Sequence, residues 1–358
     1  MKQISVSLRG GYDIHIGQGI LGTVGEATRR LFPKAQSVAV ITDDTVKKLY
    51  LESVMNALIT AGFSTLPYPL PPGEGSKSAN EYFDLLNWLA SNRLTRSDII
   101  IALGGGVVGD LAGFAAATYL RGVAYIQMPT TLLAMVDSSV GGKTGIDLKA
   151  GKNLAGAFHQ PSFVLCDIDV LDTLPVHIYN DGIAEVVKYG MLGSTELLNR
   201  LLDTPSKKDL EQIIAECITM KRDIVQNDEF DLGERKLLNF GHTIGHAIEF
   251  LSNYKISHGA AVGIGMTIIT RAAFKQKLCP PECFNMLRKL LLRFNLPDKT
   301  SYSAQELYNA AISDKKRQGA FITIIVPTAF GKCELKTIPV ESLLDWIEMG
   351  LEPFEPSL

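Results

Sequence analysis

Short apolar runs and stretches with helical spacing alternate over the first half of the chain. The β-branched run from Ser37 to Thr42 predicts a strand, and the spacing from Thr45 to about Thr60 predicts a helix after it. The apolar run from Asp98 to Leu103 predicts a buried strand, which glycines separate from a helix at Leu111–Leu120. Further strands are predicted at Val123–Met128 and Phe163–Cys166. This alternation is typical of βαβ units, in which helices cover both faces of a parallel sheet.

From about Tyr179 onward, helical spacing dominates the pattern. Ile183, Ala184 and Val187 share one helical face, and further helical runs follow at 207–227, 236–251, 259–277 and 281–294. Two β-rich runs appear late, at 320–326 and 333–338. We therefore predict an α/β domain at residues 1–178 and a mostly helical domain at residues 179–358. The short connection between them favours a binding site in the crevice between the two halves.

Composition and charge exclude several classes of protein. The 358 residues are 46% hydrophobic and 20% charged, which is typical of a globular protein and not of a disordered, collagenous or coiled-coil chain. A net charge of −3 disfavours general nucleic-acid binding. The most apolar region, Gly104–Leu120, contains Asp110, so we expect no membrane span, and the N-terminal residues lack the apolar core of a signal peptide. The odd count of five cysteines predicts reduced thiols in a reducing compartment, which is consistent with a cytoplasmic protein.

A glycine-rich turn is the first candidate for chemistry. Residues 104–110, GGGVVGD, follow a predicted strand, open a predicted helix and satisfy the pattern G-x-G-x-x-G. Glycines there let the backbone approach a pyrophosphate, although tight strand–helix packing is an alternative explanation. The acidic residue expected about twenty positions later is absent, because position 129 is proline. Asp43, at the end of a predicted strand, is the candidate to bind the ribose instead.

Two more polar loops lie in the same half, at Pro72–Lys77 and Asp137–Gly145. The second resembles a P-loop, but Asp137 occupies the position where that motif requires glycine, so a P-loop is excluded. Its Gly-Gly-Lys-Thr sequence, with Lys152 and Asn153 following, still suits contacts to an anion or a ribose. Solvated loops explain one such segment more easily than several in one domain.

A histidine cluster is the second candidate. His242, His246 and His258 lie close together in the sequence, and the first two have the i, i+4 spacing that places both on one helical face. Such a pair can bind one metal ion, but the motif H-T-I-G-H lacks the glutamate of HExxH, which argues against a metalloprotease. We expect Arg235 and Asn239 on the same helical face. A single histidine would more often be a structural polar group, whereas the cluster favours a metal site.

Charged residues accompany that cluster. Glu185 and Lys188 form an i, i+3 pair, which is either a surface ion pair or, since their neighbours are mostly apolar, part of a cleft. Arg222 and Lys236 are explained by solvated helix faces. An excess of cations suits a small polyanionic substrate such as a sugar phosphate, and it comprises Lys143, Lys152, Lys188, Lys221 and Arg235.

Several longer segments resemble 3-dehydroquinate synthases of the sugar phosphate cyclase superfamily. They are GGGVVGDLAGFAAATYLRG, MPTTLLAMVDSSVGGKTGID, GKNLAGAF, GIAEVVKYG and RKLLNFGHTIGHAIE, and His258-Gly259 follows them. They keep the family's order from about residue 37 to about residue 335. The resemblance implies a Rossmann-like α/β domain, a mostly helical second domain and an NAD- and zinc-dependent enzyme, with Co²⁺ as a possible substitute. It implies the shikimate-pathway reaction that converts 3-deoxy-D-arabino-heptulosonate 7-phosphate to 3-dehydroquinate and phosphate.

The resemblance also implies roles for individual residues. The metal ligands are Glu185, His242 and His258, although helical spacing alone favours His246 as the second histidine. The NAD contacts are Asp43, Glu74, Lys77, Gly105, Gly106, Val107, Gly109, Asp110, Thr130, Thr131, Lys143, Lys152 and Thr173. The catalytic and substrate contacts are Asp137, Lys143, Lys152, Asn153, Lys188, Lys221, Arg235, Asn239, His246 and one lysine of Lys315-Lys316, for which we select Lys316. Arg121 resembles an arginine that reaches the phosphate bound by a neighbouring subunit, which implies a homodimer.

One departure and three alternatives stay open at this point. Ala260 stands where the family usually carries glutamate, two residues after the last histidine ligand. A related cyclase that makes 2-deoxy-scyllo-inosose or a valiolone would share the NAD and metal motifs, although Asn239 and His246 argue against it. A metal-dependent polyol dehydrogenase would release NADH, and a non-enzymatic NAD-binding protein would not need the Glu185, His242 and His258 set.

Overall fold

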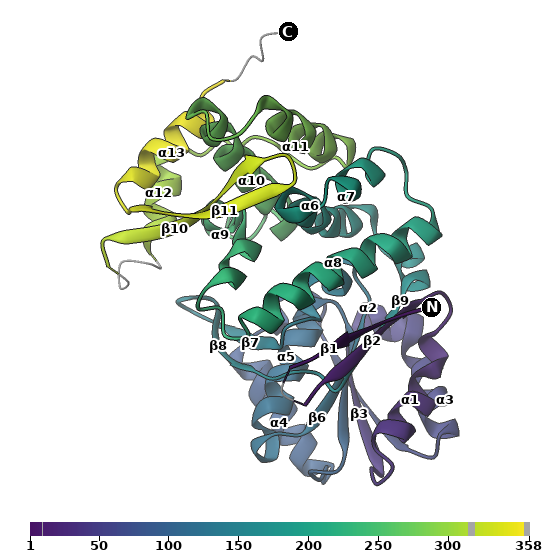
Figure 1. The fold of residues 1–358 in the computed structure, drawn as a ribbon. Helices are drawn as coiled ribbons and strands as arrows, with labels where there is room; N and C mark the ends of the chain where they lie inside the picture. The colour runs from purple at the N-terminus through teal and green to yellow at the C-terminus, as the bar shows by residue number, and fades with distance from the viewer. Residues whose placement is uncertain (9, 314–318, 354–358) are drawn as a thin grey trace. The chain divides into compact units, whose positions relative to one another are not determined.

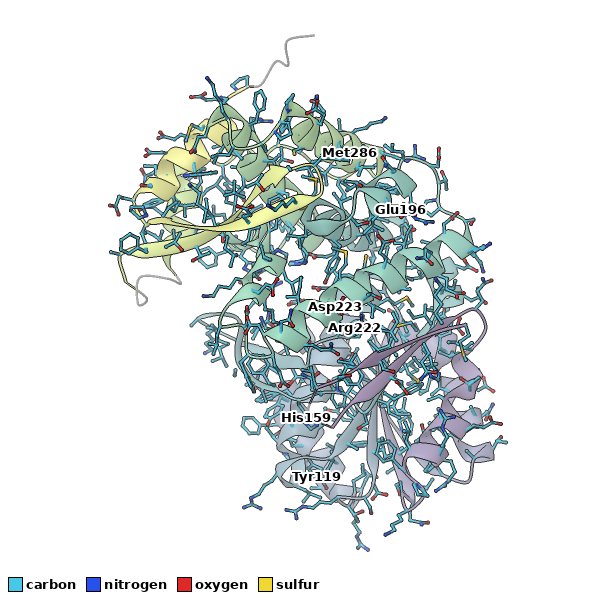
Figure 2. The ribbon with its side chains drawn as sticks, viewed as in Figure 1. Tyr119, His159, Glu196, Arg222, Asp223 and Met286 are labelled. Carbon is cyan, nitrogen blue, oxygen red and sulfur yellow. The ribbon has the colours of Figure 1, made fainter. Side chains whose placement is uncertain are left out.

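The computed structural model describes residues 1–8, 10–313 and 319–353, and it divides the chain into two units. Unit 1 comprises Met1–Leu174 and Leu210–Arg222, and unit 2 comprises Pro175–Asp209 and Asp223–Leu358. Helix α8 (Lys207–Asn227) therefore contributes to both units, since its middle belongs to unit 1 and its two ends belong to unit 2. Arg222 and Asp223, labelled in Figure 2, are the last residue of the middle part and the first residue of the second end. The expected α/β domain and mostly helical domain are both present, so the predicted fold class is confirmed.

Unit 1 is built on a seven-stranded sheet with the order β1-β2-β9-β6-β5-β3-β4. Its strands are β1 (Lys2–Val6), β2 (Tyr12–Gly17), β3 (Ser37–Asp43), β4 (Ser64–Leu70), β5 (Ile99–Gly104), β6 (Ala124–Pro129) and β9 (Phe163–Asp167). Only β1 and β2 pair antiparallel. The four predicted strands correspond to β3, β5, β6 and β9. Strand β4 was not predicted, since Pro67 and Pro69 interrupt its pattern, and it lies at an edge of the sheet.

Alternate residues of the central strands face two different helical layers (Figure 1). Val38 and Val40 of β3 pack in one apolar cluster with α1 (Val24–Leu31) and α3 (Glu52–Thr60). Ala39 and Ile41 pack in a second cluster with α4 (Ala79–Ser91) and α5 (Gly106–Thr118). Both faces of the strand are buried, which explains why its sequence is continuously apolar rather than alternating.

The strand order reverses direction between β3 and β5. The chain runs from β3 outward to β4 at the edge and then returns to β5 on the opposite side of β3. The carboxyl ends of β3 and β5, at Asp43 and Gly104, are therefore neighbours. In open α/β sheets, ligands bind at such a reversal. The helix predicted at 45–60 is a continuous helical segment made of α2 (Asp44–Val46), the π-helical η2 (Lys47–Leu51) and α3.

A small hairpin of β7 (Lys143–Leu148) and β8 (Gly151–Phe158) also belongs to unit 1. The sequence predicted a loop at Asp137–Gly145, and this prediction is wrong for its second part. Lys143, Thr144 and Gly145 pair with Phe158, Ala157 and Gly156 of β8. The sequence did not predict this strand because its glycines and charged residues do not form the alternating apolar pattern that is typical of a strand.

Unit 2 is mostly helical. Its elements are α6 (Val176–Gly193), α7 (Thr195–Arg200), α9 (His242–Leu251), α10 (His258–Lys275), α11 (Pro281–Arg293), α12 (Ala304–Ser313), β10 (Phe321–Ala329), β11 (Lys332–Pro339) and α13 (Ser342–Leu351). The single helix predicted at 236–251 is wrong. A 3-10 helix, η7 (Glu234–Asn239), precedes a break at Gly241, whose φ of +80° is left-handed, and α9 begins only at His242.

Glycines bring α9 and α10 close together. A Cβ atom on Gly265 of α10 would lie 2.1 Å from the carbonyl oxygen of Gly241, and one on Gly245 would lie 3.1 Å from the Cα atom of Val262. The two helices that carry the three clustered histidines therefore pack backbone against backbone. Among the described residues, none of the helices combines the length and the apolar content that a membrane crossing requires.

Candidate functional site

In unit 1, the glycine-rich turn joins β5 to α5. Gly105 caps α5 without a side-chain hydrogen bond, so the cap residue offers no acceptor to the first-turn N–H groups. A Cβ atom on Gly105 would lie 3.0 Å from Cγ2 of Thr131, and one on Gly106 would lie 3.1 Å from Oγ of Ser138. Thr130 is buried, and its N–H donates to the carbonyl oxygen of Gly104 at 3.0 Å. Because these glycines have no side chains, the backbone of the turn stays accessible, as a phosphate-binding turn requires.

A buried lysine lies next to this turn. Lys77 is 4% exposed, and its Nζ atom lies 2.8 Å from Oδ2 of Asp110 and 4.0 Å from Oδ1 of Asp147. The same ammonium donates to the side-chain oxygen of Asn153. Burial opposes the charge on Lys77, but Asp110 and its other acidic neighbours outweigh burial and raise the pKa of the ammonium. Lys77, Asp110, Asp147 and Asn153 form one polar group, named here the Lys77 cluster.

The β7–β8 hairpin supplies part of this cluster. The N–H of Asp147 donates to the carbonyl oxygen of Lys77 at 2.7 Å, and the N–H of Asn153 donates to the Asp147 carboxylate at 2.8 Å. Asn153 has a left-handed φ of 57°. Beside it, Nζ of Lys152 lies 3.2 Å from Oε1 of Glu74. The structure therefore brings together residues from the Pro72–Lys77 loop, from α5 and from the hairpin, and the resemblance selected all of them except Asp147, which sequence reasoning missed.

A second pair in unit 1 connects α8 to η5 (Ala134–Ser138). Nζ of Lys221 lies 2.6 Å from the carbonyl oxygen of Asp137 and 2.7 Å from its carboxylate Oδ1. Lys221 is 6% exposed. Lys221 lies in the part of α8 that belongs to unit 1, whereas helical spacing alone places this segment in the helical half. The pair joins two of the predicted substrate contacts.

Two other predicted residues of unit 1 make local contacts, and two more are exposed. The Asp43 carboxylate accepts hydrogen bonds from the N–H groups of Thr45 and Val46 and caps α2. Thr173 bonds to the hydroxyl of Tyr50 and to the carbonyl oxygen of Val170. Arg121 is exposed, with a left-handed φ of 68°, at the end of η4 (Tyr119–Arg121), and Lys143 is exposed at the start of β7. Among the described contacts of Asp43, Thr173 and Arg121, none leads to the Lys77 cluster.

In unit 2, Glu185 is the centre of a buried polar group. It is fully buried on α6, and its Oε2 atom pairs with Lys188, which is 1% exposed. Its Oε1 atom lies 3.4 Å from Nε2 of His242 and 3.2 Å from Nε2 of His258. Burial opposes ionisation, but Lys188 and the histidines hold the pKa of Glu185 well below its usual range. The Glu185–Lys188 pair is therefore buried and is not a surface ion pair.

The two histidines present the same ring nitrogen to Glu185. Nδ1 of His242 lies 3.1 Å from the carbonyl oxygen of Phe240, and Nδ1 of His258 lies 3.3 Å from Oε2 of Glu249. Both Nδ1 partners are acceptors, so Nδ1–H can donate to each of them, and Nε2 is the nitrogen that faces Glu185 and that would bind a metal ion once it carries no proton. Ligand atoms of Glu185, His242 and His258 lie within 4.8 Å of one another. Three converging lone-pair donors fit a tetrahedral zinc-type ion that keeps a position open for substrate.

The electrostatics of the group favour a cation. Burial alone would lower the pKa of His258, but its hydrogen bonds to the carboxylates of Glu185 and Glu249, and the charges of those carboxylates, raise it to about 10. The three residues that the resemblance selected as metal ligands thus occupy a place where positive charge is stabilised.

The remaining predicted residues of unit 2 are His246, Arg235, Asn239 and Lys316. His246 is exposed on α9, and its ring centroid lies 5.4 Å from that of His242 and 6.2 Å from that of His258. Arg235 is 2% exposed, and it lies with Asn239 on η7. The expectation that these two share a helical face with the histidines is wrong, since α9 begins after the turn at Gly241. Lys316 lies outside the described residues.

Two acidic residues near His258 were missed by sequence reasoning. Glu249 is 3% exposed on α9 and contacts Nδ1 of His258. The Asp181 carboxylate, on α6, accepts a hydrogen bond from Oγ of Ser257 at 2.6 Å, immediately before His258 begins α10. Glu249 has a signal that could have found it, because it follows His242 by seven residues and so shares its helical face.

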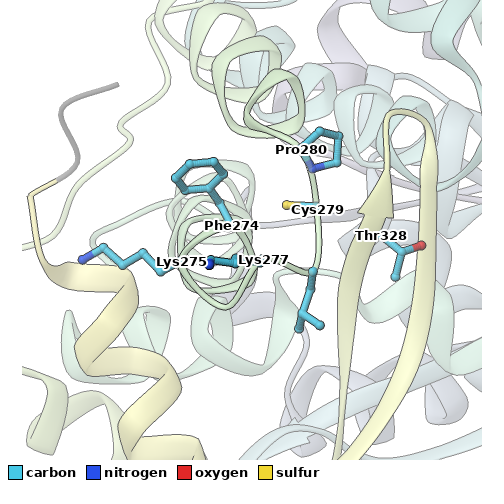
Figure 3. Close-up of a pocket in the computed structure, with 7 residues that line it drawn as sticks. Phe274, Lys275, Lys277, Cys279, Pro280 and Thr328 are labelled. Carbon is cyan, nitrogen blue, oxygen red and sulfur yellow. The ribbon is translucent and has the colours of Figure 1, made fainter. Parts of the chain in front are cut away.

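A cavity of about 540 Å³ lies elsewhere in unit 2 (Figure 3). Its described lining residues are Phe274, Lys275, Lys277, Leu278, Cys279, Pro280 and Thr328. None of them is a residue that the sequence predicted for a site, so the cavity does not form part of the candidate site.

Comparison with known proteins identifies what the chain resembles. The family profile for the 3-dehydroquinate synthase N-terminal domain matches residues 67–181, and that for the C-terminal domain matches residues 182–317. A 3-dehydroquinate synthase of Enterococcus faecalis is 46% identical over 93% of this chain and 94% of its own length. One of Clostridium kluyveri is 42% identical over 97% and 98%.

A solved structure with the same fold has a different name. It is a 2-deoxy-scyllo-inosose synthase complexed with carbaglucose-6-phosphate, NAD⁺ and Co²⁺, with a TM-score of 0.87 and 24% identity. The alignment covers 98% of this chain and 100% of that one. At this identity the likeness shows the fold alone.

Proposed function

This chain belongs to the 3-dehydroquinate synthase family, and on that basis we propose that it converts 3-deoxy-D-arabino-heptulosonate 7-phosphate to 3-dehydroquinate and phosphate. The identity of 46% to an Enterococcus faecalis 3-dehydroquinate synthase supports the family's activity over that of other cyclases. The observation that carries the proposal is the convergence of Glu185, His242 and His258 beside the buried ammonium of Lys188. Such an arrangement suits a substrate that offers hydroxyl groups to a metal and negative charge to cations.

We propose that NAD⁺ and a divalent metal, Zn²⁺ or Co²⁺, are the cofactors. When bound, NAD⁺ would accept and return one hydride at C5 of the sugar, and the metal would act as a Lewis acid toward its hydroxyl groups. The proposal is supported by the solved inosose synthase, which is complexed with NAD⁺ and Co²⁺. The domain at 1–178 would bind NAD⁺, and the domain at 179–358 would supply the metal ligands.

The chain's own residues would bind and orient the reactants. Glu185, His242 and His258 would hold the metal, and the Gly104–Asp110 turn would accept the pyrophosphate of NAD⁺ at the N-terminus of α5. The other NAD contacts would be Asp43, Glu74, Lys77, Thr130, Thr131, Lys143, Lys152 and Thr173. The substrate contacts would be Asp137, Lys143, Lys152, Asn153, Lys188, Lys221, Arg235, Asn239, His246 and Lys316. Several of these cations are held by acidic neighbours, so their positions are fixed before the substrate arrives.

The proposed sequence of steps places modest demands on acid–base groups. Oxidation at C5 acidifies the proton at C6, phosphate leaves by β-elimination, C5 is reduced again, the ring opens, and an intramolecular aldol reaction closes the carbocycle. The departing phosphate can take the C6 proton itself. Positioning and charge stabilisation by Lys188, Lys221, Arg235 and their neighbours would then supply most of the catalysis.

We also propose a homodimer in the cytoplasm. Arg121 would reach the phosphate bound by the partner subunit, and its exposure on a left-handed turn supports an outward role. All five cysteines are buried thiols, which supports a reducing compartment.

The decisive experiment is phosphate release from 3-deoxy-D-arabino-heptulosonate 7-phosphate with NAD⁺ and Zn²⁺, with and without a chelator. We expect chelator-sensitive release, 3-dehydroquinate as the product and no net NADH. Release of phosphate only from glucose 6-phosphate, with an inosose as product, would instead favour the related cyclase whose fold the chain shares. Net NADH without phosphate release would indicate a polyol dehydrogenase.

A further inference from the structure

We propose that Glu249 is a positioning residue for the metal site: it holds His258 in the tautomer, and at the ring angle, that binding through Nε2 requires. The inference rests on the proposed metal dependence and assigns a role to a residue that is not itself one of the three ligands. The carboxylate lies 3.3 Å from Nδ1 of His258, and Nε2 of the same ring lies 3.2 Å from Glu185. The ring is thus held between two carboxylates, one at each nitrogen.

Burial makes this contact consequential. Glu249 is 3% exposed, and an ionised carboxylate that is removed from water requires a donor. His258 provides one through Nδ1–H, so Nε2, which faces Glu185, is the nitrogen that would lose its proton to a metal ion and bind it. Loss of the carboxylate would let the ring rotate or adopt the opposite tautomer, whose Nε2–H cannot bind a metal.

The two histidine ligands are oriented by groups of different charge. His242 donates to the neutral carbonyl oxygen of Phe240, whereas His258 faces the anionic Glu249. A carboxylate partner increases the electron density on the ligating nitrogen more than a carbonyl does. Removing the charge of Glu249 should therefore weaken metal binding even when a hydrogen-bond acceptor remains.

The alternative to an orienting role is that Glu249 itself binds the metal ion. Atoms of His246, Glu249 and His258 form a second group within 4.8 Å. His246 is the exposed member of that group, whereas Glu185 and His242 are both buried. The buried group also has both histidine tautomers set by Nδ1 acceptors, so we assign the ion to Glu185, His242 and His258 and the orienting role to Glu249.

The test measures metal affinity rather than turnover. Apo-protein would be titrated with Zn²⁺ in competition with a chromophoric chelator, and the Co²⁺ form would be followed by its visible absorption bands. The variants are Glu249→Gln, which keeps the shape and removes the charge, and Glu249→Ala. The matched control is Asp298→Asn, which removes another buried carboxylate of unit 2, the one that pairs with Arg288 at 2.7 Å.

We expect Glu249→Gln to bind Zn²⁺ about 10- to 100-fold more weakly than wild type, with Glu249→Ala weaker still and Asp298→Asn unchanged. The Co²⁺ bands of loaded Glu249→Gln should keep their intensity, because the three ligands remain. Wild-type affinity in Glu249→Gln would overturn the proposal. Loss of all metal binding, with Co²⁺ bands of a different coordination number when the variant is forced to load, would overturn it too, since Glu249 would then be a ligand.

Failure of the proposed function is a separate outcome. If wild-type protein bound neither Zn²⁺ nor Co²⁺, the metal-dependent function would fail together with this inference. If the wild type bound metal and Glu249→Gln matched it, only the inference would fail. Should Glu249→Gln not fold, the ¹⁵N NMR shifts of the imidazole of zinc-loaded wild-type protein decide the question. We expect a protonated Nδ1 and a ligating Nε2 for His258, and metal bound at Nδ1 would overturn the role of Glu249.

Discussion

Gly259 lies against the backbone of Asp181 so closely that a Cβ atom on it would stand 2.4 Å from the carbonyl oxygen of Asp181. Gly259 follows His258 at the start of α10, and Asp181 precedes Glu185 by one helical turn on α6. This contact therefore sets the separation between two of the proposed metal ligands. Since the neighbour is backbone rather than a flexible side chain, it cannot yield without a shift of one helix.

Substitution of Gly259 by alanine should disturb both folding and the metal site. We expect Gly259→Ala to lower the free energy of unfolding by about 1–3 kcal/mol and to weaken Zn²⁺ binding by at least about tenfold, because His258 moves away from Glu185. Chemical denaturation and chelator competition measure the two effects. Gly22→Ala is the control, because a Cβ atom on Gly22 would meet nothing within 4 Å. Equal metal affinity in Gly259→Ala would show that the packing does not set the ligand geometry.

Lys221 offers a test of the substrate contacts in unit 1. Its ammonium bonds to both the backbone oxygen and the carboxylate of Asp137. We expect Lys221→Met to lower kcat/KM about 100-fold or more while NAD⁺ affinity changes less than about twofold, since an anchoring cation is lost from the substrate and not from the cofactor. Lys208→Met, at an exposed position of the same helix, is the control. A matching loss of NAD⁺ affinity would contradict the assignment to substrate.

Asp98 predicts a pH dependence of stability. Its carboxylate accepts hydrogen bonds from the N–H groups of Gln36, Ser37 and Thr95 and from the Thr95 hydroxyl. Burial opposes ionisation, but these hydrogen bonds outweigh it and lower the pKa of Asp98 below its ordinary value. The folded pKa is the lower one, so the stabilisation is fully present above the unfolded pKa of about 3.9 and is lost as the pH falls through the folded pKa.

Comparison of Asp98→Asn with wild type measures this contribution. We expect the free energy of unfolding of Asp98→Asn at pH 7 to be about 1.5–3 kcal/mol lower than that of wild type, because hydrogen bonds to a charged acceptor are lost. The difference should shrink below about pH 4, as wild-type Asp98 becomes neutral. Urea denaturation at several pH values gives both numbers, with Asp44→Asn as an exposed control. A difference that stays constant from pH 7 to pH 3 would be inconsistent with a charge-based contribution.

Arg121 allows the proposed dimer and its shared site to be tested together. We expect Arg121→Ala to weaken substrate binding and to leave NAD⁺ affinity unchanged, because only the phosphate loses a partner. At a substrate concentration too low for Arg121→Ala to turn over appreciably, mixing it with His258→Ala subunits should restore about a quarter of wild-type activity, since half of the random dimers would carry one intact site. No recovery in subunits shown to exchange would place Arg121 in the site of its own chain.

The central strands were predictable because burial on both faces gives them a simple sequence pattern. Strands such as β5 are buried on both faces, so Ile99, Ile100 and Ile101 form a continuous apolar run. The break before α9 was not predictable, because Leu237 and Leu238 continue the helical spacing, whereas the chain leaves helical geometry at Phe240, whose ψ is 123°, and at Gly241, whose φ is +80°. The β7–β8 hairpin has no apolar alternation that marks a strand.

For the candidate site, too, local sequence patterns predicted some residues and missed those that long-range packing brings together. The i, i+4 spacing favoured the pair His242 and His246, because spacing reports only neighbours on one helix. His258 begins a different helix, and its contact with Glu185 depends on how α6, α9 and α10 pack through glycines. That packing is long-range, and it was the likeness of whole segments to a family, rather than local pattern, that selected His258. Glu249 was missed for a related reason, since its partner also lies on another helix.

Strand β4 has a consequence for the behaviour of the protein at high concentration. Residues 67 and 69, both prolines, alternate along this edge strand, so they share one side of its backbone. Neither can donate a hydrogen bond, so the backbone at these positions faces away from β3, on the side where a foreign strand would have to dock. The same two residues that obscured the strand in the sequence therefore protect the sheet against edge-to-edge aggregation with another copy of the chain.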